Sequence, residues 1–226
     1  MIRDNIFKVR ERVDAACLRA KREPSAVTIV AVSKGRPAEQ VKEALGAGIL
    51  DIGENRVQEA LLKYDQLRDS GLVIKWHMVG HLQTNKVKDA VRIFDLIQSV
   101  DSLRLAEEID RQASKINKVQ DILFEIKTSP EETKTGVDPD KAAEVMKEAG
   151  RLKNINVKGL MTIAPIVEDP GQARQFFRKL REISENLFGR HPETDASVLS
   201  MGMTDDFETA VEEGATMVRI GRAIFG

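Results

Sequence analysis

Short apolar runs and longer amphipathic segments alternate along the whole chain. One run, Val27 to Val32, is almost entirely apolar and ends abruptly at Ser33-Lys34-Gly35. It is too short for a typical helix and too apolar for a strand with one wet face, so it predicts a strand buried on both faces, as in a parallel sheet. The same pattern predicts eight strands, over residues 27–32, 51–53, 73–79, 94–100, 119–126, 157–161, 197–199 and 215–220.

Helical periodicity occupies the intervals between these runs. Apolar residues recur every three or four positions over residues 2–20, which predicts an amphipathic helix with a charged outer face. Asp101 or Ser102 suits the N-cap of a later helix, and Asp205 and Glu208 have the spacing of a capping box. The other predicted helices cover residues 37–47, 55–67, 84–91, 102–116, 139–149, 170–187 and 205–213.

Strict alternation of strands and helices requires parallel strands joined by right-handed crossovers. Eight such strands predict an α/β fold, a closed (β/α)8 TIM barrel, here with an extra N-terminal helix. At 226 residues the chain is somewhat shorter than the roughly 250 residues typical of this fold, so we expect short connections and one domain over residues 1–226. The alternative is an open doubly wound sheet, which favours a G-x-G-x-x-G turn after the first strand. The stretch VSKGRPAEQ is not such a turn.

Composition narrows the classes of protein. The net charge is −1 and the 35 Lys and Arg residues are dispersed, so we expect no nucleic-acid partner. The longest apolar runs are strand-length and the N-terminus lacks a signal-peptide core, so we expect no membrane span. One cysteine and three histidines, without metal-ligand spacing, argue against an internal disulfide and against a metal site. These features predict a reducing, cytoplasmic location.

The carboxyl ends of the strands are where a barrel of this kind carries its active site. There, Lys34 is either a solvated side chain or an amine desolvated enough to act as a nucleophile. The loops after the last two strands, the recurrent phosphate site of such barrels, offer hydroxyls from Ser200 and Thr204 and close backbone approach at Gly202 and Gly221. A lysine facing a phosphate site predicts a phosphorylated carbonyl compound bound as a Schiff base, either pyridoxal 5′-phosphate (PLP) or a sugar-phosphate aldehyde.

Charged groups beside the phosphate loops bear on this choice. Arg219 ends the last predicted strand, and an arginine keeps its proton and so leaves a pyridine nitrogen neutral, which favours PLP. The alternative is that acidic neighbours hold Arg219 at the end of the strand. Asp205 and Asp206 would repel a phosphate dianion unless their side chains turn away to cap the next helix.

Several motifs, in order, closely resemble the pyridoxal phosphate homeostasis protein family (YggS/PROSC type). They are VAVSKGRPAEQVKEALGAGILDIGENRVQEA, WHMVGHLQTNK, GLMTIAP and LSMGMTDDFETAVEEGATMVRIGRAIFG. The resemblance runs from about Val27 to the C-terminus, and the family is similar in fold to the barrel domain of alanine racemase. It implies a protein that buffers or delivers PLP and takes part in vitamin B6 homeostasis, without a firmly assigned reaction.

The resemblance also implies roles for individual residues. Lys34 would form the Schiff base with PLP, and Arg219 would face the pyridine nitrogen. The residues implied to hold the phosphate are Ser200, Gly202, Met203, Thr204, Gly221 and Arg222. The residues implied to line the ring pocket are Asn55, His77 and Met161.

This chain departs from the family pattern in two places. Family members usually carry Thr or Ser where this chain has Arg222, whose guanidinium could replace or supplement the hydroxyl. The stretch from residue 125 to residue 136, after the fifth predicted strand, also differs from the usual sequence. Nearby, Lys86, Lys88 and Lys134 are either solvated or form a secondary contact with an amine or an anion.

Two functions are open: a PLP carrier and a PLP-dependent amino-acid racemase. Racemisation by two bases needs an acid or base on each face of the cofactor. The only tyrosine, Tyr64, falls on a predicted helix, where packing explains it better than catalysis. An uncovered barrel mouth also leaves water near the cofactor. We therefore expect a monomeric, non-catalytic carrier, with PLP and amino acids or amines as its ligands.

Overall fold

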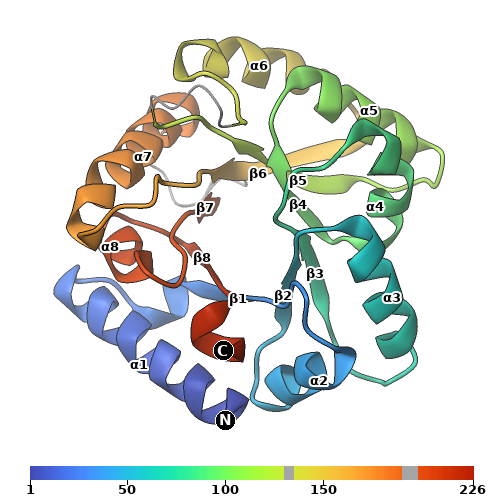
Figure 1. The fold of residues 1–226 in the computed structure, drawn as a ribbon. Helices are drawn as coiled ribbons and strands as arrows, with labels where there is room; N and C mark the ends of the chain where they lie inside the picture. The colour runs from blue at the N-terminus through green and yellow to red at the C-terminus, as the bar shows by residue number, and fades with distance from the viewer. Residues whose placement is uncertain (130–134, 190–197) are drawn as a thin grey trace.

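Eight parallel strands close into a barrel surrounded by helices (Figure 1). This computed structural model describes residues 1–129, 135–189 and 198–226. Each strand pairs with the next along the chain, and β8 pairs with β1 to complete the ring. The strands are β1 (Thr28–Val32), β2 (Asp51–Glu54), β3 (Lys75–Met78), β4 (Leu96–Val100), β5 (Gln120–Glu125), β6 (Ile155–Met161), β7 (Val198–Ser200) and β8 (Met217–Ile220). The predicted TIM barrel is confirmed.

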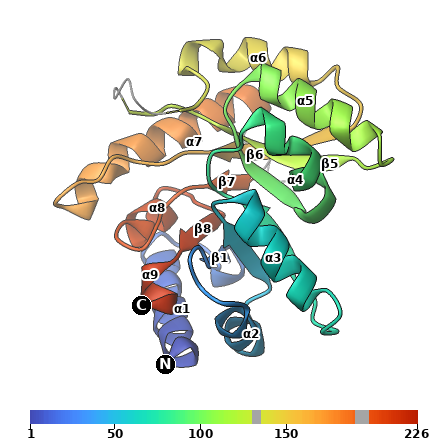
Figure 2. The ribbon, with the colours of Figure 1, turned by 45° about the vertical axis from the view of Figure 1, so that its right-hand side comes forward.

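The helices follow the predicted alternation. They are α1 (Ile2–Arg19), α2 (Ala38–Gly46), α3 (Val57–Leu67), α4 (Val87–Ile93), α5 (Leu103–Ser114), α6 (Ala142–Ala149), α7 (Arg174–Phe188), α8 (Phe207–Glu212) and α9 (Arg222–Phe225). The predicted N-terminal helix, α1, packs against α8, α9 and α2 (Figure 2). Because α9 has only four residues, α1 provides most of the cover for the barrel between α8 and α2.

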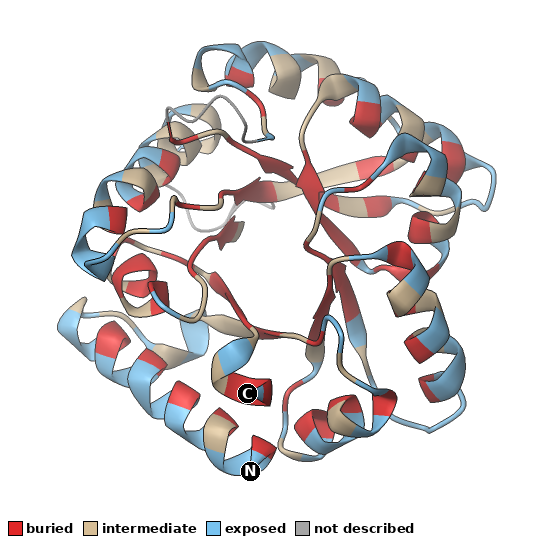
Figure 3. Cartoon of the chain, in the orientation of Figure 1, coloured by how far each residue is buried: buried red, intermediate tan, exposed pale blue. Residues whose placement is uncertain are grey.

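The core has two parts, because alternate residues of each strand face the barrel interior and the helices. Most of the buried apolar residues lie between the strands and the helix faces turned toward them (Figure 3). A small separate cluster comes from strand residues alone. Its members are Val30, Leu96, Leu123, Met161 and Met217. Polar side chains occupy much of the remaining interior, as described below.

The predicted caps differ in their outcome. Ser102 caps α5, where its Oγ accepts a hydrogen bond from the Leu105 N–H at 3.3 Å. The predicted capping box of Asp205 and Glu208 is wrong, because α8 begins two residues later than expected and its N-cap is Asp206. Tertiary partners explain the difference, since the carboxylates of Asp205 and Glu208 pair with arginines of other helices.

The third strand and two other predictions compare with the structure as follows. The third strand is shorter than expected and covers only residues 75–78. Ser197, predicted to begin the seventh strand, and Lys134 lie outside the described residues. In the described part of the chain, no helix has both the length and the apolar character needed to cross a bilayer.

Candidate functional site

The barrel mouth brings Lys34 together with the loops after β7 and β8. Strand β1 pairs with β8, with Val30 opposite Arg219, and β8 pairs with β7. Lys34 follows β1 at the carboxyl end of this group of strands, where the two loops also begin. Its side chain is exposed and, within the described residues, forms no hydrogen bond or ion pair. Of the two alternatives for Lys34, the exposed side chain agrees with a solvated lysine, and a reactive role for its amine stays a prediction.

Arg219 places a buried positive charge beneath this rim. Its guanidinium donates hydrogen bonds to Ser200 Oγ at 2.7 Å and to the Thr162 carbonyl oxygen at 2.8 Å. Burial lowers the pKa of Arg219 to about 10, although the carboxylates of Glu125 and Asp206 oppose the shift. The arginine therefore stays protonated at neutral pH. Its direct partners are a hydroxyl and a carbonyl oxygen. The structure thus differs from the alternative in which acidic neighbours hold the arginine at the end of the strand.

A chain of hydrogen bonds continues from Arg219 through the barrel interior. Ser200 Oγ donates to Gln98 Oε1 at 2.6 Å, and Gln98 Nε2 lies 3.0 Å from His77 Nδ1. His77 Nε2 in turn lies 2.9 Å from Asp51 Oδ1, at the amino end of β2. The side chains of Ser200 and His77 are thus used inside the barrel. Both side chains therefore lie in the barrel interior below the rim. Ser200 was expected to belong to the loop after the seventh strand instead.

The loop after β7 is held tightly against α8. Gly202 has φ +92°, and a Cβ there would lie 2.6 Å from Ala210 Cβ, so only glycine fits without a shift of the helix. The Met203 N–H donates to Asp206 Oδ1 at 2.6 Å. Burial raises the pKa of Asp206 above its ordinary value, although the hydrogen bond from Met203 opposes this. The amide of Met203, expected to contact phosphate, is therefore already paired with Asp206.

Two contacts join this loop to the start of α9, which follows β8. Thr204 Oγ1 lies 3.5 Å from the Ala223 N–H, at the limit of a hydrogen bond. Arg222 forms an exposed ion pair with Asp205. The guanidinium partly offsets the charge of Asp205, one of the two carboxylates expected to repel a phosphate. The pair connects the loop after β7 to the start of α9.

A buried ion pair beside Lys34 was missed by the sequence analysis. Glu54 Oε1 accepts hydrogen bonds from Lys63 Nζ and from Ser33 Oγ, each at 2.5 Å. Lys63 Nζ also donates to the Ser33 carbonyl oxygen at 2.6 Å. Burial raises the pKa of Glu54, although the hydrogen bonds from Lys63 and Ser33 oppose it. These three residues fix the backbone immediately before Lys34.

The two remaining predicted ring-pocket residues lie at different depths. Met161 is fully buried in the interior apolar cluster. Asn55 lies on the rim, where it lines a cavity between the loops after β2 and β3. Gly80 packs against the Asn55 backbone, and a Cβ at that glycine would lie 2.5 Å from the Asn55 carbonyl oxygen. Their contact with a ring stays a prediction.

Comparison with known proteins places this barrel in a family. The family model described as alanine racemase, N-terminal domain, matches residues 4–226. The pyridoxal phosphate homeostasis protein of Aquifex aeolicus is 45% identical over 223 residues, which is 99% of this chain and 96% of that protein. The chain belongs to the pyridoxal phosphate homeostasis protein family. The family member from Escherichia coli K12 is 37% identical over 229 residues, covering 100% of this chain and 96% of that protein.

Solved structures agree with membership in the pyridoxal phosphate homeostasis protein family. PipY of Synechococcus elongatus, solved with PLP bound, has a TM-score of 0.86 and 36% identity, and the match covers 100% of both chains. A protein of Bifidobacterium adolescentis has a TM-score of 0.92 and 38% identity over 99% of this chain and 94% of that chain. Alanine racemase of Clostridium difficile has a TM-score of 0.70 at 14% identity, covering 100% of this chain and 56% of that chain. That last likeness shows the fold alone.

Proposed function

We propose that this chain binds PLP at the barrel mouth, through a Schiff base between Lys34 and the cofactor aldehyde. We further propose that it acts as a carrier in intracellular vitamin B6 homeostasis. One observation carries the proposal: an exposed lysine amine with no partner among the described residues follows β1, and a buried guanidinium lies on β8, the strand paired with β1. The names of the relatives and the PLP in the PipY structure support it.

The donor set fits this cofactor. When bound, PLP supplies an aldehyde that condenses with amines. Lys34 offers an accessible amine for that bond. Arg219 offers hydrogen-bond donors only, so it favours a pyridine nitrogen that is not protonated and limits the ring as an electron sink. Hydrogen bonds to Ser200 and Thr162 hold the guanidinium in a fixed position.

The phosphate group would lie against the loops after β7 and β8. Gly202 allows close backbone approach on one side, and the Arg222–Asp205 pair joins the two loops. The proposed phosphate contacts remain those that the resemblance implies. They are Ser200, Gly202, Met203, Thr204, Gly221 and Arg222. Ser200, Met203 and the Arg222 guanidinium would each have to exchange a present partner for the phosphate. The proposed contacts therefore depend most on Thr204 and on the backbone N–H groups of Gly221 and Arg222.

The surroundings of the site favour a carrier over a racemase. Tyr64 packs against Trp76 with ring centroids 6.3 Å apart, which supports a packing role for the only tyrosine. His81 Nδ1 lies 3.2 Å from Asp101 Oδ2 on the exposed rim. These contacts account for both side chains without a role as a second base. The proposed ligands are PLP with amino acids or amines, and the proposed state is a cytoplasmic monomer, in keeping with a single buried cysteine, Cys17.

Titration with PLP tests the proposal. The native protein is expected to develop a visible Schiff-base absorption band, and Lys34→Ala is expected to lose it. Lys88→Ala, which changes another exposed lysine, is the matched control and should keep the band. An unchanged band in Lys34→Ala would refute the role of Lys34. Incubation with L- or D-alanine then separates the functions, because racemisation at about 1 per second or faster would favour the enzyme.

A further inference from the structure

Two of the motifs that mark the family, GENRVQEA and GHLQTNK, meet in one cavity at the barrel mouth. The first motif spans the end of β2 and the start of α3, and the second follows β3. Their side chains line a cavity of about 360 Å³. Its polar lining residues are Asn55, Arg56, Gln58, His81, Gln83 and Lys86. Asn55 aside, the proposed cofactor site uses none of these residues.

The lining of this cavity is cationic. Arg56 and Lys86 carry fixed positive charges, and none of the described residues that line the cavity is an Asp or Glu. Within the described residues, the side chain of Lys86 forms no hydrogen bond or ion pair. Arg56 lies 3.7 Å from Glu59 Oε1, but its side chain is 77% exposed, so this pair is weak. The other oxygen of Glu59 accepts a hydrogen bond from the Gly35 N–H at 3.0 Å and so faces Lys34 rather than the cavity.

Neutral donors complete the set. The Nδ1 atom of His81 faces Asp101, so a neutral His81 ring donates its one N–H there and adds no donor to the cavity. The amide groups of Asn55, Gln58 and Gln83 can each donate. Helix α3 begins at the cavity with no side-chain cap, and its first N–H groups add further donors. These neutral groups add to the charges of Arg56 and Lys86, and the proposal rests on those two charges.

We propose that this cavity binds the phosphate group of a small phosphate monoester. Two fixed positive charges match a phosphate that carries a charge between about −1.5 and −2 at pH 7, and an arginine fork suits its oxygens. A carboxylate would match only one of the charges. The cavity also contains Val57 and Met78, which offer apolar contact to the rest of a small ester. The site is separate from the proposed cofactor phosphate site, which follows β7 and β8 on the far side of β1 (Figure 1).

Site-resolved NMR of the full chain tests this proposal. Inorganic phosphate, and then glycerol phosphate, is titrated into ¹⁵N-labelled protein, and the backbone amides of Val57, Gln58 and Lys86 are followed. We expect saturable shifts of these amides, with tighter binding for the ester. Lys86→Gln should weaken binding roughly tenfold, as expected for the loss of one charge-assisted contact. Lys88→Gln, an exposed lysine of α4 outside the cavity, is the matched control and should bind like the native protein.

Two results would overturn the proposal. One is a titration in which only the amides of Thr204 and Arg222 shift, because phosphate would then bind the proposed cofactor loop alone. The other is equal affinity in Lys86→Gln and the native protein. Circular dichroism and melting temperature establish that each variant is folded. Since the two sets of amides report separately, failure of this site and failure of the cofactor site are distinguishable.

Discussion

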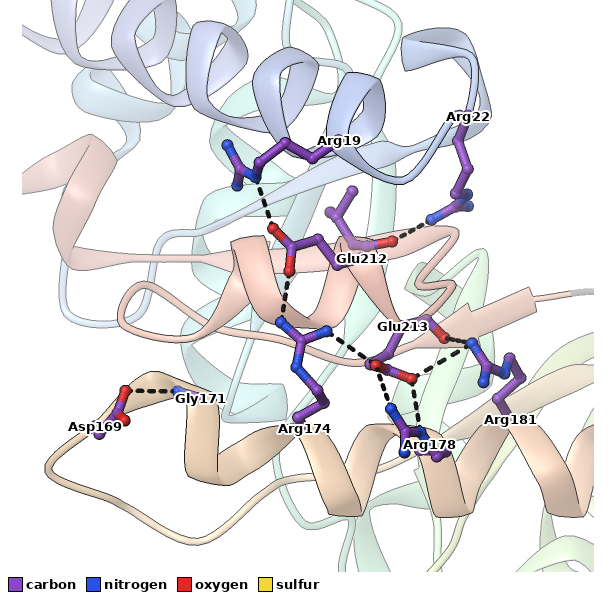
Figure 4. A network of polar contacts seen from close by, with 10 residues as sticks. Arg19, Arg22, Asp169, Gly171, Arg174, Arg178, Arg181, Glu212 and Glu213 are labelled. Atoms are coloured by element: carbon purple, nitrogen blue, oxygen red, sulfur yellow. Dashed lines mark hydrogen bonds and ion pairs between the residues drawn. The ribbon is translucent and has the colours of Figure 1, made fainter.

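Glu213 joins α7 to the end of α8, and its removal is the most direct test of how this part of the ring is stabilised. Its carboxylate lies 2.9 Å from Arg174, 3.2 Å from Arg178 and 3.4 Å from Arg181, all of α7 (Figure 4). The Glu213 side chain is only 6% exposed, whereas the three arginine side chains are between 35% and 53% exposed. Glu213→Gln keeps the shape of the side chain and removes its charge.

The expected loss follows from these exposures. An ion pair with a half-exposed arginine contributes up to about 1 kcal/mol, so three pairs contribute up to about 3 kcal/mol. Glutamine keeps one oxygen that can still accept a hydrogen bond, so we expect a net loss of about 2 kcal/mol in the free energy of unfolding. At about 2.1 cal/mol/K per residue, 226 residues give an unfolding entropy near 0.5 kcal/mol/K, and the melting temperature should fall by about 4 °C.

The dependence on pH gives a second readout. Burial raises the pKa of Glu213, but the guanidinium groups of Arg178 and Arg174 outweigh it, so the pKa lies below its ordinary value. A lowered pKa means that the stabilisation is present above the unfolded pKa of about 4.3 and is lost as pH falls through the folded pKa. The difference between native and variant should therefore be constant near neutral pH and shrink in acid.

Thermal unfolding followed by circular dichroism measures both effects. Glu208→Gln is the control on the same helix, because Glu208 forms one exposed pair with Arg12. It should shift the melting temperature by no more than about 2 °C. If Glu213→Gln melted with the native protein, or if the difference persisted unchanged below about pH 3, the ion-pair account would be refuted.

Three further predictions concern the barrel and its mouth. Gly159 has φ +146°, and Gly159→Ala places a methyl group against a backbone oxygen of β7, so the free energy of unfolding should fall by about 3 kcal/mol or more in chemical denaturation. Gly150→Ala is the control and should be nearly neutral, because the nearest atoms lie 3.5 Å from a Cβ there. Lys63→Met leaves the Glu54 carboxylate buried and unpaired and should cost about 3 to 5 kcal/mol; adding Glu54→Leu should recover most of it, and no recovery would contradict the pairing. Arg219→Glu should favour a protonated pyridine nitrogen in bound PLP, and an unchanged absorption spectrum and affinity would exclude the proposed partner role.

The barrel could be predicted because its signals are local. Strands buried on both faces appear as short apolar runs, and their strict alternation with helices leaves few topologies. Parallel strands bring their carboxyl ends to one rim, so the meeting of Lys34 with the loop at Gly202 followed from the strand count alone. The N-cap at Ser102 also depends only on its own helix, and it is confirmed.

The features that the sequence did not show depend on partners that are distant in the sequence. Asp205 does not cap α8, because Arg222 lies within reach after β8. The direction in which His77 points depends on barrel register, which places it against Gln98 and Asp51 in the interior.

The buried pair of Glu54 and Lys63 did leave a signal. Lys63 falls on the same buried stripe of α3 as Val57, Ala60 and Leu67. A lysine on an apolar stripe, with a glutamate at the end of the preceding buried strand, indicates an internal ion pair.

Borohydride reduction of the PLP-loaded protein, followed by mass spectrometry of its peptides, tests the central claim most directly. Reduction makes the bond between cofactor and amine permanent. A Schiff base at Lys34 predicts one modified site, Lys34, with the buried Lys63 and the cavity residue Lys86 unmodified. A reduced adduct on another lysine, with Lys34 free, would contradict it.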